Sequence, residues 1–185
     1  MLTPKIVRRK TAGVNRAPVI RDVDASRDAN EVARLWHDYL SWGNDGLELR
    51  YGFRLPVDEA VEQDLHSIAK FLPPDGRLLL AVQADRAIGT SALQRIGPET
   101  AEIKRMWVDP AHRRAGTSRA MLDHLIAAAV AAGYERIRLD SPDFMTSAHA
   151  LYRSFGFVTI GPYPESEIPD QFKSHWVFME RALRT

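Results

Sequence analysis

The spacing of apolar residues along the chain predicts seven short strands. A continuous apolar run at 78–82 is typical of a strand that is buried on both faces, and 87–96 follows it after a short hairpin connection. Between 101 and 108 the alternation is imperfect, which indicates a bulge or a splayed strand end. The remaining strands are predicted at 19–23, 136–140, 157–160 and 175–181.

A period near 3.6 residues predicts four helices between these strands. The first begins after Asp24 or Ser26 and ends at the breaker cluster 41–46, and the second begins at Pro56. The third runs from about 117 to Gly133, and the fourth from 146 to 155. This order predicts a mixed α/β fold, in which an antiparallel meander leads into a strand–helix–strand crossover.

Composition narrows the function classes. The chain has 185 residues and a net charge of +1, so we expect one domain at 19–185 behind a basic lead-in at 1–18, with no affinity for nucleic acid or membrane surfaces. Cysteine is absent, which excludes disulfides and thiolate chemistry. The six histidines show no ligand spacing, so we predict no metal. Without a secretory signal core or a long apolar run, a cytoplasmic protein is expected.

The stretch 102–122 carries the first candidate site. Asp109 and Pro110 end a strand, and a basic segment with one glycine then opens a helix. Backbone N–H groups, a helix N-terminus and arginines converge there, which is the chemistry of a phosphate site. The alternative is an ordinary helix start with a solvated basic cluster. The segment matches neither a Walker loop nor a dinucleotide fingerprint.

A second motif lies at 148–157, where a helix ends in Gly156 and runs directly into a strand. Tyr152 lies one turn before that end. A phenol in this place can donate a proton to a leaving group in a cleft, or it can be a core tyrosine with a satisfied hydroxyl.

Together the two motifs resemble the GCN5-related N-acetyltransferase (GNAT) family. The family signature Arg/Gln-x-x-Gly-x-Gly/Ala, after a Val-x-Pro strand end, is matched at 108–118, and Ala-x-x-Leu-Tyr-x-x-x-Gly-Phe is matched at 148–157. Two positions depart from the family pattern. Ser118 replaces the last small residue of the signature, and Met145 replaces an asparagine that often contacts the cofactor.

The resemblance implies a mostly antiparallel central sheet flanked by helices and splayed at its central strands, with acetyl-CoA as co-substrate. The strand backbone at Met106, Trp107 and Val108 would pair with pantetheine, and an N–H near Trp107 or Val108 would support the oxyanion. The predicted pyrophosphate site is Arg113, Arg114, Ala115, Gly116, Thr117 and Ser118, with Arg119 as a further charge.

The resemblance also implies two catalytic residues. Tyr152 would protonate the departing thiolate, and Glu102 would be the general base that takes the proton of a primary amine. For Glu102 the alternative is an exposed strand carboxylate paired with Lys104 or Arg138.

The expected acceptor is a small molecule, an amino acid or a peptide, and a homodimer is compatible with the family. We expect the acceptor pocket to be built from the two N-terminal helices and the segments 42–53 and 161–172. These supply Trp36, Tyr39, Trp42, Asp45, Glu48, Tyr51, Tyr163, Glu165 and Glu167. The competing function is a non-catalytic acyl-CoA-binding sensor of the same fold.

Overall fold

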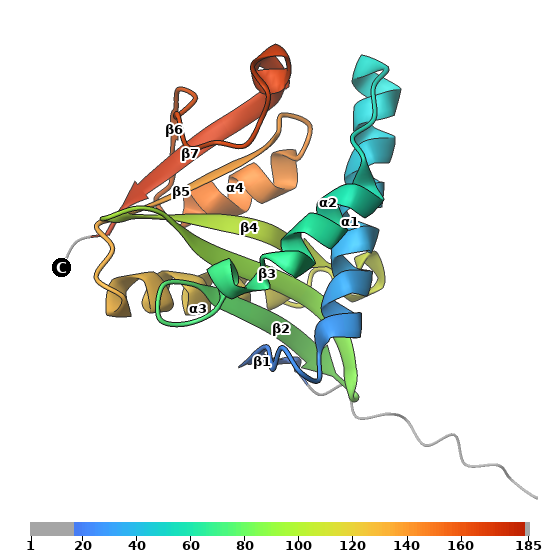
Figure 1. Ribbon diagram of the computed structural model, residues 1–185, viewed down its shortest axis with the longest axis vertical. Helices are drawn as coiled ribbons and strands as arrows, with labels where there is room; N and C mark the ends of the chain where they lie inside the picture. Colours follow the sequence, from blue (N-terminus) through green and yellow to red (C-terminus); the bar gives the residue numbers. More distant parts are fainter. Residues whose placement is uncertain (1–16, 184–185) are drawn as a thin grey trace, which may run out of the picture.

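The computed structural model describes residues 17–183, so the predicted lead-in at 1–18 lies almost wholly outside the described residues. The described chain forms a seven-stranded sheet in the order β1-β2-β3-β4-β5-β7-β6 (Figure 1). Neighbouring strands are antiparallel except for β4 and β5, which are parallel. The strands are β1 (Val19–Asp22), β2 (Arg77–Gln83), β3 (Arg86–Gly97), β4 (Thr100–Val108), β5 (Arg136–Pro142), β6 (Val158–Ile160) and β7 (Trp176–Ala182).

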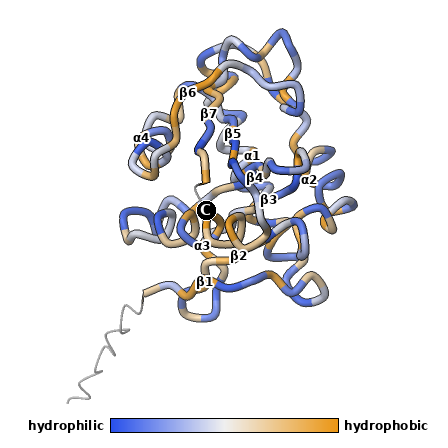
Figure 2. The backbone as a smooth tube through the Cα atoms, turned by 90° about the vertical axis from the view of Figure 1, so that its left-hand side faces the viewer, coloured by the Kyte–Doolittle hydropathy of each residue, from blue (hydrophilic) through white to orange (hydrophobic). Residues whose placement is uncertain are grey.

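Helices cover both faces of this sheet (Figures 1 and 2). One face carries α1 (Ala29–Tyr51) and α2 (Val57–His66), and the other carries α3 (Thr117–Ala131) and α4 (Thr146–Ser154). Leu78 and Leu80 pack with the α1 core, whereas Leu79 packs with the α3 core, which explains the continuous apolar run. Three 3₁₀ turns complete the chain: η1 (Ile68–Phe71), η2 (Pro110–His112) and η3 (Asp170–His175). No helix in the described part is long and apolar enough to cross a membrane.

The two central strands separate soon after they meet. β4 and β5 pair only from Thr100 with Arg136 to Glu102 with Arg138, and β5 then pairs with β7 as far as Pro142. The far halves of β4 and β5 therefore diverge and leave a gap in the sheet. The predicted mixed, mostly antiparallel sheet with splayed central strands is confirmed.

A bulge accounts for the imperfect alternation of β4. Its pairing with β3 shifts between Thr90 and Ala92, and Arg105 adopts a φ of 53° there. The extra residue lets two successive side chains project toward the helix α2 side, because Arg105 reaches Asp64 of α2 while Lys104 keeps its place on the same face.

The predicted end of the first helix at 41–46 is wrong, since α1 continues to Tyr51. Tertiary contacts override the helix-breaking residues there. The Asn44 side chain is buried, donating to the Leu55 carbonyl and accepting from the Leu55 amide. A Cβ on Gly46 would lie 2.5 Å from the Phe144 ring, so the glycine lets that ring rest against the helix.

Candidate functional site

Two cavities adjoin at the gap between β4 and β5. The inner pocket, about 280 Å³, lies between α1, α2, the diverging strands and the 161–175 loop. The outer slot, about 270 Å³, runs from there toward the N-termini of α3 and α4. They share five lining residues, namely Tyr39, Met106, Met145, Ala148 and Tyr152. The two cavities therefore adjoin at a shared wall that includes Tyr152.

The end of β4 and the start of α3 build one wall of the outer slot. Five of the ten predicted cofactor-binding residues line it: Met106, Trp107, Val108, Arg113 and Ser118. The Arg113 guanidinium lies 4.5 Å from the centroid of the Trp107 ring and 5.3 Å from that of Trp42, and its Nε donates to the Val108 carbonyl. The Arg113 side chain therefore contacts both Trp42 and the end of β4, and it stabilises this wall of the slot.

The N-terminus of α3 has the free donors that an anion needs. Gly116 is the N-cap with a φ of 78°, and no side chain caps the helix. Thr117 is 3% exposed, and its hydroxyl has no hydrogen-bond partner within residues 17–183. Arg114 and Ala115 are exposed, while Arg119 turns toward α4, where it donates to Ser154. These five residues, 114–117 and 119, do not line the slot.

Tyr152 lies where the two cavities join. The residue is 6% exposed, and its hydroxyl donates to the Met106 sulfur at 3.5 Å, a weak acceptor. Burial raises the pKa of the Tyr152 phenol, and nearby Tyr39 and Asp140 act in the same direction. The phenol therefore stays protonated at neutral pH and can give its proton to a stronger base that enters the junction.

Glu102 is fully buried and lines neither cavity. One carboxylate oxygen accepts from the Tyr163 hydroxyl at 2.5 Å; the other accepts from Gln94 at 2.8 Å and lies 3.5 Å from the Lys104 ammonium. Burial raises the pKa of Glu102, and Lys104 opposes that shift. The pairing with Lys104 agrees with the alternative expectation for this residue, but the expected exposure is wrong, because Glu102 is fully buried. Arg138 pairs with Glu180 and Glu165 instead.

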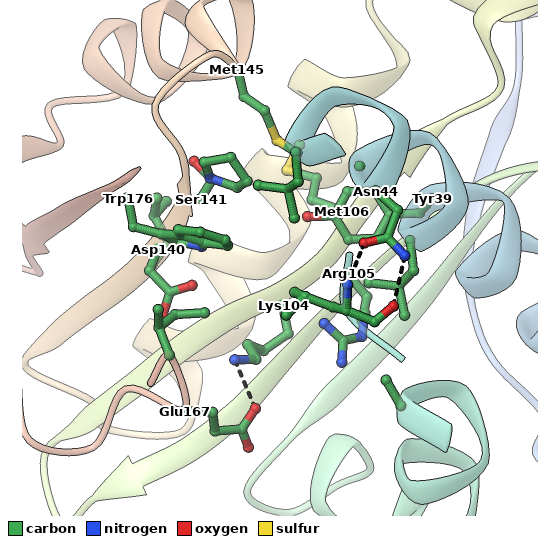
Figure 3. Close-up of a pocket in the computed structure, with 18 of the residues that line it drawn as sticks. Tyr39, Asn44, Lys104, Arg105, Met106, Asp140, Ser141, Met145, Glu167 and Trp176 are labelled. Carbon is green, nitrogen blue, oxygen red and sulfur yellow. Dashed lines mark hydrogen bonds and ion pairs between the residues drawn. The ribbon is translucent and has the colours of Figure 1, made fainter. Parts of the chain in front are cut away.

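Four charged residues that sequence reasoning did not single out line the inner pocket or reach it through a partner: Lys104, Arg105, Asp140 and, behind Arg105, Asp64. Asp140 comes from β5 and lies across the pocket from Tyr39 and Asn44 of α1 (Figure 3). The irregular hydrophobic pattern of β4 was the signal for the two cations, because the bulge turns both toward the pocket.

The residues predicted for the acceptor pocket have different positions. Tyr39 and Glu167 line the inner pocket, and Trp42 lines the outer slot. Tyr163 binds Glu102, and Tyr51 stacks on His175 with ring centroids 3.9 Å apart. The others are in the core or in ion pairs with arginine: Trp36, Asp45, Glu48 and Glu165.

Comparisons with known proteins agree with this geometry. The model of the acetyltransferase (GNAT) family matches residues 35–157. An uncharacterized N-acetyltransferase, C1271.07c, from Schizosaccharomyces pombe is 28% identical over 153 residues, covering 82% of this chain and 89% of that protein. The IAA acetyltransferase of Azospirillum brasilense is 34% identical over 139 residues, covering 74% and 86%.

The fold recurs in a solved structure, the PaiA N-acetyltransferase of Thermoplasma acidophilum in complex with coenzyme A. It has a TM-score of 0.70 at 15% identity, covering 91% of this chain and all of that one (100%). The family model spans both the slot and the junction at Tyr152. The chain therefore belongs to the GNAT acetyltransferase family.

Proposed function

We propose that this protein transfers the acetyl group of acetyl-CoA to a primary amine. The observation that carries the proposal is that the outer slot and the inner pocket adjoin at a shared wall that includes Tyr152. A donor that enters from one side and an acceptor from the other bring their reacting atoms to this junction. The two motifs of the family lie on either side of it.

The outer slot suits a chain that ends in a pyrophosphate. Uncapped N–H groups at the start of α3, toward which the slot runs, would supply donors for the phosphates. Beyond Glu102 the edge of β4 is not paired with β5, so its backbone can bond an amide-bearing arm. Acetyl-CoA bound there would supply a thioester whose carbonyl carbon is open to attack. Ser118, the departure from the family signature, lines the slot and adds a hydroxyl donor.

Tyr152 is the proposed general acid. Its proton rests on a thioether, which a thiolate would displace as the acceptor. Its raised pKa keeps the phenol protonated until the leaving group forms. Glu102, the base that the family resemblance implies, would need a water to relay the proton, because both of its oxygens are engaged and it lines neither cavity.

The test is thiol release from acetyl-CoA in the presence of a panel of primary amines, including amino acids, peptides and polyamines. We expect Tyr152→Phe to lower kcat about 100-fold, the lower end of a general-acid contribution. Tyr134→Phe is the matched control, since this buried phenol donates to the Asp75 carbonyl away from both cavities.

Coenzyme A should raise the melting temperature of the wild-type protein and of both variants. A rise without turnover of any amine would overturn the proposal and favour the acyl-CoA sensor.

A further inference from the structure

The cations around the inner pocket are already committed to carboxylates. Lys104 is 9% exposed in its side chain and lies 3.0 Å from Glu167 (Figure 3). Its ammonium is also 3.5 Å from Glu102. Although burial opposes its charge, the pKa of Lys104 is raised because Glu102, Asp140 and Glu167 surround it. Lys104 therefore stays charged and lies between two carboxylates, that of Glu102 on β4 and that of Glu167 on the 161–175 loop.

Arg105 and Lys70 share a third carboxylate, that of Asp64. Arg105 contacts one oxygen of Asp64 at 2.7 Å through Nε and 2.5 Å through Nη2, and Lys70 contacts the other at 2.8 Å. Asp64 is 4% exposed, so these contacts are shielded from water. The three cations Lys70, Lys104 and Arg105 are thus balanced by the three acids Asp64, Glu102 and Glu167.

Asp140 is the charge left over. One of its oxygens accepts from Ser166 at 2.9 Å and lies 3.4 Å from the Tyr163 hydroxyl, whose proton goes to Glu102. Within residues 17–183 no cation forms an ion pair with Asp140, and its other oxygen has no donor. The three cations and four acids around the inner pocket therefore leave a net charge of −1. Asp140, on the β5 wall and held by Ser166, is the acid without a direct ion pair, although Lys104 is near enough to interact with its charge.

Most of the other lining residues are apolar, and Asn44 and Ser141 are the polar ones among them. The apolar residues include Leu40, Leu47, Leu55, Val57, Ile168 and Trp176. A cavity of about 280 Å³ is near the lower end of ligand pockets, which run from roughly 300 to 1,000 Å³. Such a space accepts the body of a small molecule, and burying an anion there beside Asp140 would be costly.

We infer that the acceptor is a primary amine with an apolar body and no carboxylate, and that Asp140 receives its ammonium group. The inference rests on the proposed function and deepens it. Asp140 takes one proton from the ammonium, which frees the nitrogen lone pair to bond the acetyl carbon while the C–S bond breaks. Tyr152 protonates the thiolate, and the acylated nitrogen, which still carries two protons, gives one of them to the Tyr152 phenolate so that a neutral amide remains. One proton per turnover thus leaves through Asp140 to solvent.

Matched acceptors test the substrate class with the full chain. Phenethylamine, phenylalanine and phenylalaninamide share one body and differ only at the carbon beside the amine, and isoamylamine, leucine and leucinamide form a second set. We expect kcat/KM for each amine to exceed that for its amino acid by about 100-fold, since like charges placed together cost several kcal/mol. The carboxamides should lie within about tenfold of the amines, because they add size without charge.

Variants test the assigned charges. Asp140→Asn should lower kcat/KM for the amines about 100-fold and leave the melting-temperature rise with coenzyme A unchanged. Glu167→Gln should free Lys104 and raise the rate with an amino acid, relative to its amine, about tenfold. Asp58→Asn is the control, since this side chain is 92% exposed and pairs only with His37 within the described chain; its ratios should equal those of the wild type.

Three results would overturn the inference while acetyl transfer stands: amino acids used as well as their amines, a polyamine used in preference to both sets, or Asp140→Asn with wild-type kinetics. Should Asp140→Asn fail to fold, the acceptor sets and Glu167→Gln still decide. A failure to acetylate any amine of the wider panel would instead overturn the proposed function.

Discussion

Replacing Glu102 with glutamine separates two roles for this buried carboxylate. The amide has nearly the same size, so the change removes the charge and leaves the volume. In the structure Glu102 holds the Tyr163 hydroxyl, the Gln94 amide and the Lys104 ammonium. An amide cannot accept from all three, because one of its two terminal atoms is a donor. We therefore expect Glu102→Gln to act mainly on stability.

The magnitude follows from the contacts that are lost. Leaving one member of a buried ion pair without its partner costs about 3–5 kcal/mol. Lys104 keeps Glu167 at 3.0 Å, which retains part of the compensation, so we expect a loss of about 2–3 kcal/mol in the free energy of unfolding. For a domain of this size that corresponds to a melting temperature lower by about 5–10 °C.

The assay is urea unfolding followed by circular dichroism, beside kcat measured well below the melting temperature. A double variant, Glu102→Gln with Lys104→Met, should recover about 2 kcal/mol relative to the sum of the single changes, because no buried ammonium then remains. The reasoning is refuted if the unfolding free energy stays within about 0.5 kcal/mol of the wild type while kcat falls 100-fold or more. That outcome would place Glu102 in the chemistry as the base.

Three further changes test other parts of the structure. Asp28→Asn should lower the free energy of unfolding by about 1 kcal/mol at pH 7, because a hydrogen bond from Arg21 lowers the pKa of Asp28 from 3.8 to about 2. The stability from this group is present above pH 3.8 and is lost as the pH falls through 2. Wild type and variant should therefore have the same stability near pH 2 in urea titrations. A variant gap that persists at pH 2 would contradict this. Gly46→Val should raise KM for acetyl-CoA severalfold, since a Cβ at this position displaces Phe144 from the outer slot, and unchanged saturation kinetics would count against it. Gly76→Ala should lower the melting temperature by about 5 °C or more, because the added Cβ meets η1 backbone atoms at 2.5–2.7 Å that cannot turn away, as thermal denaturation will show.

Local patterns in the sequence were enough to predict where the strands lie, whereas the splayed, mostly antiparallel sheet was expected from the family resemblance. The apolar run at 78–82 indicates a strand that is buried on both faces. The ends of the observed strands fall within two residues of the predicted ends. The extent of α1 was not predictable in this way. Gly46 and Asn44 are unfavourable in an isolated helix. Here Gly46 packs against Phe144, which is distant in sequence, and Asn44 bonds the backbone of Leu55 just after the helix, so tertiary contacts favour the helical conformation.

The parts of the site that follow from local sequence motifs were predictable, and the parts that depend on contacts between distant segments were not. The turn at Gly116 and the position of Tyr152 follow from two local motifs, whose residues line or border the outer slot. Asp140 had no such signal. Asp140 has no direct ion pair because Lys104 pairs with Glu102 and Arg105 pairs with Asp64, an arrangement that depends on the bulge in β4. Such contacts between distant segments cannot be predicted from local spacing.

The gap between β4 and β5 also has a mechanical meaning. Only three residue pairs of backbone ladder join the first four strands to the last three. Across the inner pocket a second attachment exists, where Tyr51 stacks on His175 and Phe53 on Phe172, with ring centroids 3.9 and 4.2 Å apart. Backbone pairing at one end of the opening and stacked rings at the other thus join the two halves of the sheet, in addition to the core that they share. A ligand chain seated in that opening would contact both halves, so its binding should make their separation harder.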